Sequence, residues 1–146
     1  MSRNLTMLTD LYQFTMMNGY MKHGMQKHVA VFDMFFRTLQ NNSVYAIMAG
    51  LEQAIDYIKN LRFNEDDLEY LRGLGIFDEE FMEYLQHFKF TGDIYAIPEG
   101  TPVFPGEPLI RVKAPIMEAQ LIETALLNLV NHQTLIATKA SKVVYA

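Results

Sequence analysis

All five prolines of this 146-residue chain lie between residues 98 and 115, and their position limits where helices can form. A proline inside a helix removes a backbone hydrogen bond and collides with the preceding turn. The stretch from Phe90 to Pro115 also contains Gly92, Gly100 and Gly106, with short apolar pieces between them. We therefore predict a small, tightly turned β unit over residues 90–115, with helical regions on both sides.

A long helical run follows this β unit, from Ile116 to the end of the chain. Thirty residues of helix would measure about 45 Å, which is longer than most helices of globular proteins. We therefore expect a break near residues 131–134. The stretch from Ile116 to Val130 is apolar on most sides, so we expect another domain or a second copy of the chain to cover it. The apolar residues 143–146 indicate that the natural sequence continues.

Polar caps and apolar spacing over residues 1–89 predict four helices and two strands. The first helix begins after Thr9 or Asp10, because either side chain can accept a hydrogen bond from a free amide of the first turn. Its buried stripe is expected to contain Leu11, Phe14, Met17 and Met21. Further helices are expected after Gly50, Asn64 and Asp78, strands over residues 29–37 and 44–48, and a turn over residues 40–43.

The strand predicted over residues 29–37 places Asp33 and Arg37 on the same face, because side chains alternate along a strand. We expect these two side chains to form an ion pair on a partly solvated surface. The whole pattern predicts the α+β class, with helices and a mixed sheet. The expected division is an α/β domain over residues 1–115, followed by a helical segment over residues 116–146.

Composition excludes several classes of protein. The absence of cysteine excludes disulfides, zinc–thiolate sites, iron–sulfur clusters and a cysteine nucleophile. Twelve basic and seventeen acidic residues give a net charge of −5, which argues against non-specific binding of nucleic acid. The sequence contains no run of about 18 apolar residues, so it predicts no membrane-spanning helix. The first residues lack an apolar signal core, so we expect a cytoplasmic protein.

One stretch, Thr9 to Gln13 with the sequence TDLYQ, is the best candidate for a binding site. The four histidines do not pair at metal-ligand spacing, and no phosphate-binding loop or nucleophile motif occurs, so we expect no metal site. The free amides of a helix start attract anions, and Tyr12 could stack on a flat aromatic ligand. The alternative is a helix cap with Tyr12 packed in the core, and the residues alone favour this alternative.

Five ordered blocks together resemble the N-terminal portion of nicotinate phosphoribosyltransferase, in the type II phosphoribosyltransferase group. The blocks are LTDLYQFTMMNGY, VAVFDMFFR, AGLEQAIDYI, FTGDIYAIPEGTPVFPGEPLIRV and EAQLIETALLNLVNHQTLIATKAS. They extend over nearly the whole chain, and their order makes the resemblance specific. It implies an N-terminal α/β domain that precedes a larger α/β barrel, and the barrel is absent from this sequence.

The resemblance also implies an activity and its site residues. Enzymes of this family join nicotinate to phosphoribosyl pyrophosphate to give nicotinate mononucleotide in NAD salvage. They are homodimers that couple the reaction to hydrolysis of ATP, with Mg²⁺, through a phosphorylated histidine of the barrel. Tyr12 matches the tyrosine that helps to sandwich the nicotinate ring, and Asp10 is the second substrate-binding candidate. Arg37, Thr138 and Lys139 are weaker candidates. We expect no catalytic residue, no bound ATP or Mg²⁺ and no activity in this chain alone.

Three alternatives remain beside this assignment. The chain could be a non-catalytic dimerisation or binding module, or a fragment of a nicotinamide or quinolinate phosphoribosyltransferase. A third alternative arises because residues 92–112 resemble the small barrel of lipoyl and biotinyl carrier domains. Carrier domains modify a lysine at a hairpin tip, and no lysine occurs between Pro98 and Pro105, so this alternative fails on the sequence itself.

Overall fold

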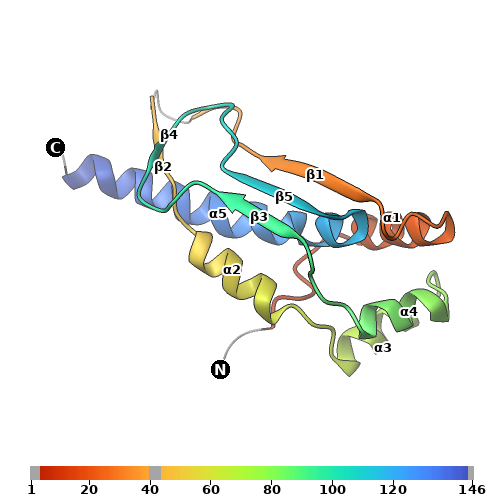
Figure 1. Cartoon of the computed structure of the whole chain (residues 1–146). Helices are drawn as coiled ribbons and strands as arrows, with labels where there is room; N and C mark the ends of the chain where they lie inside the picture. The colour runs from red at the N-terminus through yellow and green to blue at the C-terminus, as the bar shows by residue number, and fades with distance from the viewer. Residues whose placement is uncertain (1–3, 40–43, 145–146) are drawn as a thin grey trace.

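The computed structural model describes residues 4–39 and 44–144, and these residues form an α+β fold with five helices and five strands (Figure 1). The predicted α+β class is confirmed. The predicted turn over residues 40–43 lies outside the described residues. In chain order the elements are α1 (Leu11–Lys22), β1 (Val29–Met34), β2 (Ala46–Ile47), α2 (Leu51–Asn60), α3 (Glu65–Gly73), α4 (Glu79–Gln86), β3 (Asp93–Ala96), β4 (Pro102–Val103), β5 (Ile110–Pro115) and α5 (Ile116–Val144).

The strands form two small sheets whose pairings are antiparallel throughout the described residues. One sheet has the order β1–β5–β3, and the other pairs β2 with β4. The prediction of a mixed sheet was therefore wrong. Residues 90–115 contain the short strands β3, β4 and β5, as predicted for this stretch, and these strands pair in sheets that include β1 and β2. Apolar residues of β1 lie opposite apolar residues of β5, as Phe32 lies opposite Val112. These cross-strand contacts favour the pairing of β1 with β5, although the two strands are far apart in the sequence.

Helix α5 is continuous over 29 residues, about 44 Å, and has no break at residues 131–134. It runs along the sheet for most of the length of the molecule (Figure 1). Contacts with α1, α2, β1, β2 and β5 support it along its length. The Thr134 hydroxyl is within hydrogen-bonding distance of the Ala49 N–H, at 3.2 Å, and of the Ala49 carbonyl, at 3.1 Å. This packing makes the predicted break unnecessary, because tertiary contacts stabilise a helix beyond its own propensity.

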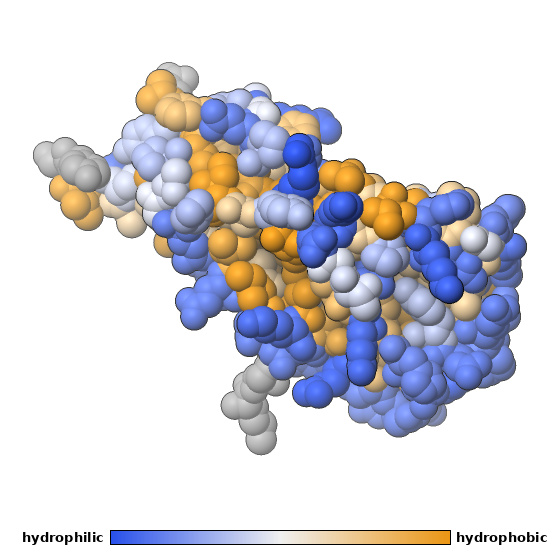
Figure 2. All heavy atoms as spheres, in the orientation of Figure 1, coloured by the Kyte–Doolittle hydropathy of each residue, from blue (hydrophilic) through white to orange (hydrophobic). Residues whose placement is uncertain are grey.

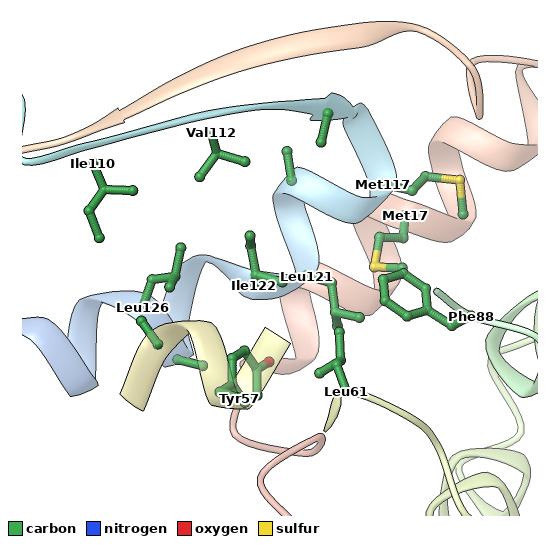
Figure 3. Close-up of a cluster of buried hydrophobic side chains, with 14 of the residues drawn as sticks. Met17, Tyr57, Leu61, Phe88, Ile110, Val112, Met117, Leu121, Ile122 and Leu126 are labelled. Carbon is green, nitrogen blue, oxygen red and sulfur yellow. The ribbon is translucent and has the colours of Figure 1, made fainter. Parts of the chain in front are cut away.

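The core lies between the sheet, α5 and α2. Figure 3 shows Ile110 and Val112 of β5 pointing toward Ile122 and Leu126 of α5, with Tyr57 of α2 on the other side. These side chains are all at least 94% buried. The apolar face of residues 116–130 is therefore covered mainly within the chain, and the expected second subunit is not needed to cover it. The division of the chain at residue 115 stays a prediction, since α5 shares its core with the preceding elements.

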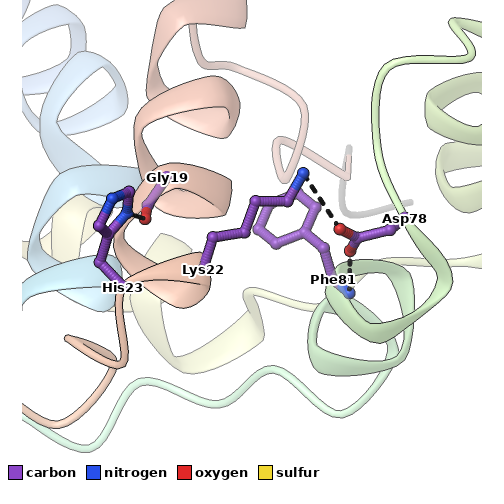
Figure 4. A network of polar contacts seen from close by, with 5 residues as sticks. All are labelled: Gly19, Lys22, His23, Asp78 and Phe81. Carbon is purple, nitrogen blue, oxygen red and sulfur yellow. Dashed lines mark hydrogen bonds and ion pairs between the residues drawn. The ribbon is translucent and has the colours of Figure 1, made fainter.

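The α3–α4 end of the molecule confirms two predicted helix caps. The Asn64 side chain accepts the Asp67 N–H at 2.8 Å, and the Asp78 side chain accepts the Phe81 N–H at 3.1 Å. Asp78 also pairs with Lys22 of α1 at 3.2 Å (Figure 4). The Phe81 amide and then the Lys22 ammonium lower the pKa of Asp78. Hydrophilic side chains cover this end, whereas apolar ones gather over α2 and the strands beside it (Figure 2).

The predicted ion pair of Asp33 has a different partner. Arg111 donates two hydrogen bonds of 2.7 Å to the Asp33 carboxylate. Antiparallel pairing places Arg111 of β5 directly opposite Asp33, whereas Arg37 lies beyond Met34, where β1 ends. The Arg111 guanidinium lowers the pKa of Asp33.

Candidate ligand site at the start of helix α1

Helix α1 begins with an N-cap at Asp10, which confirms one of the two predicted caps. The Gln13 side-chain oxygen accepts the Asp10 N–H at 3.2 Å, as in a capping box. Thr9 donates a hydrogen bond from its hydroxyl to the same oxygen. Because Gln13 is fully buried, these bonds fix the direction in which α1 enters the fold.

The buried face of α1 differs from the predicted stripe. Phe14 and Met17 are buried as expected, but Leu11 is 51% exposed. Gln13 and Asn18 are buried instead. Burial of an amide is favourable when it finds hydrogen-bond partners, and polar groups of α5 provide them for Gln13. The helix is therefore rotated away from the orientation that apolar spacing alone predicts.

Side chains from α1 and α5 form a polar cluster at this helix start. Glu123 of α5 is its centre, because it accepts hydrogen bonds from Tyr12 at 3.3 Å, from Gln13 at 3.4 Å and from Gln120 at 3.1 Å. The Thr124 hydroxyl lies 2.8 Å from a carboxylate oxygen of Asp10 and donates to it. We call Asp10, Tyr12, Gln13, Gln120, Glu123 and Thr124 the α1–α5 cluster.

Tyr12 is the one aromatic residue of the α1–α5 cluster, and 47% of it is exposed. The interpretation of Tyr12 as a core residue was therefore wrong. Partial desolvation and then the negative charge of Glu123 raise the pKa of Tyr12 above its ordinary value. A tyrosine is protonated at neutral pH even at its ordinary pKa of about 10, so the phenol can donate to Glu123. Its exposed ring is available for stacking on a flat ligand.

An apolar groove of about 370 Å³ lies between β1 and α5, beside the cluster. Val31, Met34, Ile122 and Leu127 contribute apolar side chains to it, and Glu123 lines it as well. Glu123 therefore belongs both to the α1–α5 cluster and to the wall of this groove. The capped start of α1, the exposed ring of Tyr12 and an apolar surface occur together near the N-terminal end of α5.

The weaker sequence candidates lie apart from the cluster or have structural roles. Thr138 is buried, accepts the Ile47 N–H at 2.9 Å and donates to the Thr134 carbonyl at 2.6 Å. Lys139 follows it on α5 and is exposed. Fifteen residues of helix separate Thr138 from Glu123, which is about 22 Å. Arg37 is exposed and forms no hydrogen bond or ion pair with the other described residues.

Gln13 belongs to the stretch that the sequence identifies as a candidate site, although without a role of its own, whereas Gln120, Glu123 and Thr124 were not predicted as site residues. A local signal existed for Gln13, because Asp10 and Gln13 have the spacing of a capping box. Glu123 lies early in the helical run that follows Pro115, where an acidic residue suits the positive end of a helix. Its position within the apolar stretch LIETALL was an available signal, since a carboxylate there needs polar partners when the helix is packed.

The described residues contain neither a candidate metal site nor a membrane-spanning helix. In residues 4–39 and 44–144, no three histidine, aspartate or glutamate side chains come close enough together to hold a metal ion. No helix in the same ranges is both long and apolar enough to cross a membrane. His23 and His87 each contact a backbone carbonyl of their own helices, at 2.8 and 3.0 Å.

Together, the fold and the α1–α5 cluster define an α+β domain with a candidate site for a flat ligand at a capped helix start. Residues 7–131 match the family model for the N-terminal domain of nicotinate phosphoribosyltransferase. This match extends over most of the chain, and the chain therefore belongs to this family.

Similar proteins agree with this assignment. The chain is 50% identical over 140 residues to nicotinate phosphoribosyltransferase of Bacillus subtilis, which covers 96% of this chain and 29% of that protein. It is 46% identical to nicotinate phosphoribosyltransferase pncB2 of Mycobacterium tuberculosis, with 96% and 30% covered. The crystal structure of human nicotinic acid phosphoribosyltransferase superposes with a TM-score of 0.84 at 36% identity, covering 90% of this chain and 27% of that one. The chain thus spans less than a third of the length of these relatives.

Proposed function

We propose that this chain forms the base-binding part of an enzyme that joins nicotinate to phosphoribosyl pyrophosphate, giving nicotinate mononucleotide in NAD salvage. The relatives that resemble the chain over at least 90% of its residues are named for this activity. Tyr12 is the residue to which we assign contact with nicotinate, and Asp10 is the second. The observation that carries the assignment is the ring of Tyr12, which is exposed at a helix start and whose hydroxyl donates to Glu123 of α5.

The chemistry of a nicotinate ring suits this location. The ring is flat and aromatic, so it can stack on the exposed face of Tyr12. Its carboxylate is an anion, and the free amides at the start of a helix favour an anion. Asp10 and Glu123 add negative charge nearby, and their bonds to Thr124, Tyr12, Gln13 and Gln120 occupy much of their acceptor capacity.

The remaining parts of the reaction belong, in this proposal, to sequence outside residues 1–146. We assign the phosphate and ribose contacts, the phosphorylated histidine and the ATP-coupled step with Mg²⁺ to the portion that the relatives have in addition. The proposed enzyme is a cytoplasmic homodimer in which Tyr12 reaches the site of the partner subunit. Arg37 and Lys139, which are exposed, are available to contact the added portion.

The test is a chimera in which this chain replaces the matching 29% of the Bacillus subtilis relative. We expect the chimera to form nicotinate mononucleotide from nicotinate and phosphoribosyl pyrophosphate, and the 146-residue chain alone to form none. Turnover by the chain alone at the level of the parent enzyme would disprove its assignment as one part of a site. A chimera that has the circular dichroism and melting temperature of the parent but no turnover would contradict the base-binding role.

A further inference from the structure

Glu123 joins three donors from two helices. Its Oε1 accepts from the Tyr12 hydroxyl at 3.3 Å, and its Oε2 accepts from the side-chain amides of Gln13 at 3.4 Å and Gln120 at 3.1 Å. Gln13 is fully buried and Gln120 is 96% buried, so both amides are fixed by packing. The carboxylate is therefore held on one oxygen by rigid groups and presents its other oxygen to Tyr12.

Tyr12 itself has little else to hold it. Nearly half of the residue is exposed, and its hydroxyl donates to Glu123, with the Gln13 side chain as its other polar neighbour. An exposed side chain that is free to rotate loses entropy when a ligand orders it, and this loss weakens binding. A ring that is already fixed avoids that loss. The bond to Glu123 spans 111 residues of sequence and ties α1 to α5 at this point.

We propose that Glu123 is a positioning residue that fixes the ring of Tyr12 in the orientation in which its face meets a flat aromatic ligand. This inference rests on the proposed function, because it gives Glu123 its role through the ring that stacks on nicotinate. Glu123 does not touch the ligand. It acts through the hydroxyl of Tyr12, and Gln13 and Gln120 hold it in place.

The first experiment observes Tyr12 directly in the 146-residue chain, without any ligand. Tyrosine is labelled with ¹³C in the ring, and the signal of Tyr12 is identified by its loss in Tyr12→Phe. We expect a rigid ring in the wild-type chain and a mobile one in Glu123→Ala, measured by ¹³C relaxation. Glu123→Gln keeps an acceptor oxygen and should retain most of the rigidity. Glu69→Gln, an exposed acid of α3 away from the cluster, is the control for loss of charge.

Titration of the same signal adds a second readout. Glu123 raises the pKa of Tyr12 in the wild-type chain, so the pKa should fall in both Glu123→Gln and Glu123→Ala and stay unchanged in Glu69→Gln. A general loss of stability would not move the Tyr12 titration selectively among the eight tyrosines. Equal ring mobility and equal titration in wild type and Glu123→Ala would overturn the inference.

The second experiment measures function in the chimera. We expect Glu123→Ala and Tyr12→Phe each to raise the KM for nicotinate roughly threefold with kcat nearly unchanged, as the ordering of one side chain predicts. The double variant should be no worse than either single one, because both break the same bond. Independent, multiplying effects would overturn the inference. A third outcome separates this inference from the proposed function. If Tyr12→Ala leaves the KM for nicotinate unchanged, the proposed function fails. If the ring of Tyr12 is nevertheless rigid in the wild-type chain and mobile in Glu123→Ala, the contact between the two residues still holds.

Discussion

Gly92 is a residue at which a single added methyl group should disturb this fold strongly. It immediately precedes β3 and lies beside Lys113 and Ala114, near the end of β5. A Cβ atom built on Gly92 would lie 2.7 Å from the Lys113 carbonyl oxygen and 2.9 Å from the Ala114 Cα, and closer still to the Ala114 Cβ. Carbon atoms pack best at about 3.5–4.0 Å, so Gly92→Ala requires movement of the backbone.

The loss of stability in Gly92→Ala depends on which atoms have to move to make room for the added methyl group. Overpacking of a core costs about 1–3 kcal/mol, and flexible side chains account for the lower values. Here two of the three obstructing atoms belong to the backbone of β5, the central strand of its sheet. The neighbouring Thr91 N–H and hydroxyl also bond the buried carboxylate of Glu118 in the first turn of α5. We therefore expect Gly92→Ala to lower the free energy of unfolding by about 3 kcal/mol.

Urea denaturation measures this loss. For a denaturant slope of about 2 kcal/mol/M, a loss of about 3 kcal/mol lowers the urea midpoint by roughly 1.5 M. Gly19→Ala is the matched control, because Gly19 lies inside α1 and a Cβ there meets no atom within 4 Å. That variant should gain about 0.5–1 kcal/mol from higher helix propensity. A midpoint for Gly92→Ala equal to that of the wild type would refute the close approach of residue 92 to β5.

Two further changes test the framework around the site. Thr138→Val removes the hydroxyl that accepts the Ile47 N–H, and we expect it to lower the free energy of unfolding, measured with urea, by about 1–3 kcal/mol. Thr15→Val, at an exposed position, is the control and should change it little. Equal effects of the two variants would contradict a structural role for Thr138. Burial and then the charge of Glu118 raise the pKa of Tyr84 to about 12. Because the unfolded tyrosine loses its proton first, at about pH 10, the free energy of unfolding should fall as the pH rises from 10 toward 12. Tyr84→Phe should make this fall in the urea midpoint smaller. An equal fall in the wild type and in Tyr84→Phe would contradict the burial of Tyr84.

Features that depend on neighbouring residues could be predicted from the sequence. Asn64 and Asp78 cap their helices as expected, because a cap bonds an amide three residues ahead. The N-cap at Asp10 follows the same local rule. The α+β class was also predictable, since apolar spacing and the placement of prolines are local patterns.

Features that depend on distant residues could not be predicted in this way. The partner of Asp33 is set by the register between β1 and β5, which are 78 residues apart at this pair. The continuity of α5 depends on contacts with five other elements. The exposure of Tyr12 and the burial of Gln13 both depend on how α1 is rotated against α5. The sequence alone points to residues 9–13 as a candidate site, and their binding role stays a prediction. The polar support of this stretch on α5 became visible only in the structure.

We claim above all that the ring of Tyr12 binds nicotinate, and the KM of the chimera for nicotinate measures this contact. Stacking contributes about 0.5–1.5 kcal/mol beyond the apolar area of the ring. We therefore predict that Tyr12→Ala raises the KM roughly tenfold or more, and that Tyr12→Phe, which keeps the ring, raises it much less. A KM that stays the same in Tyr12→Ala would contradict the claim.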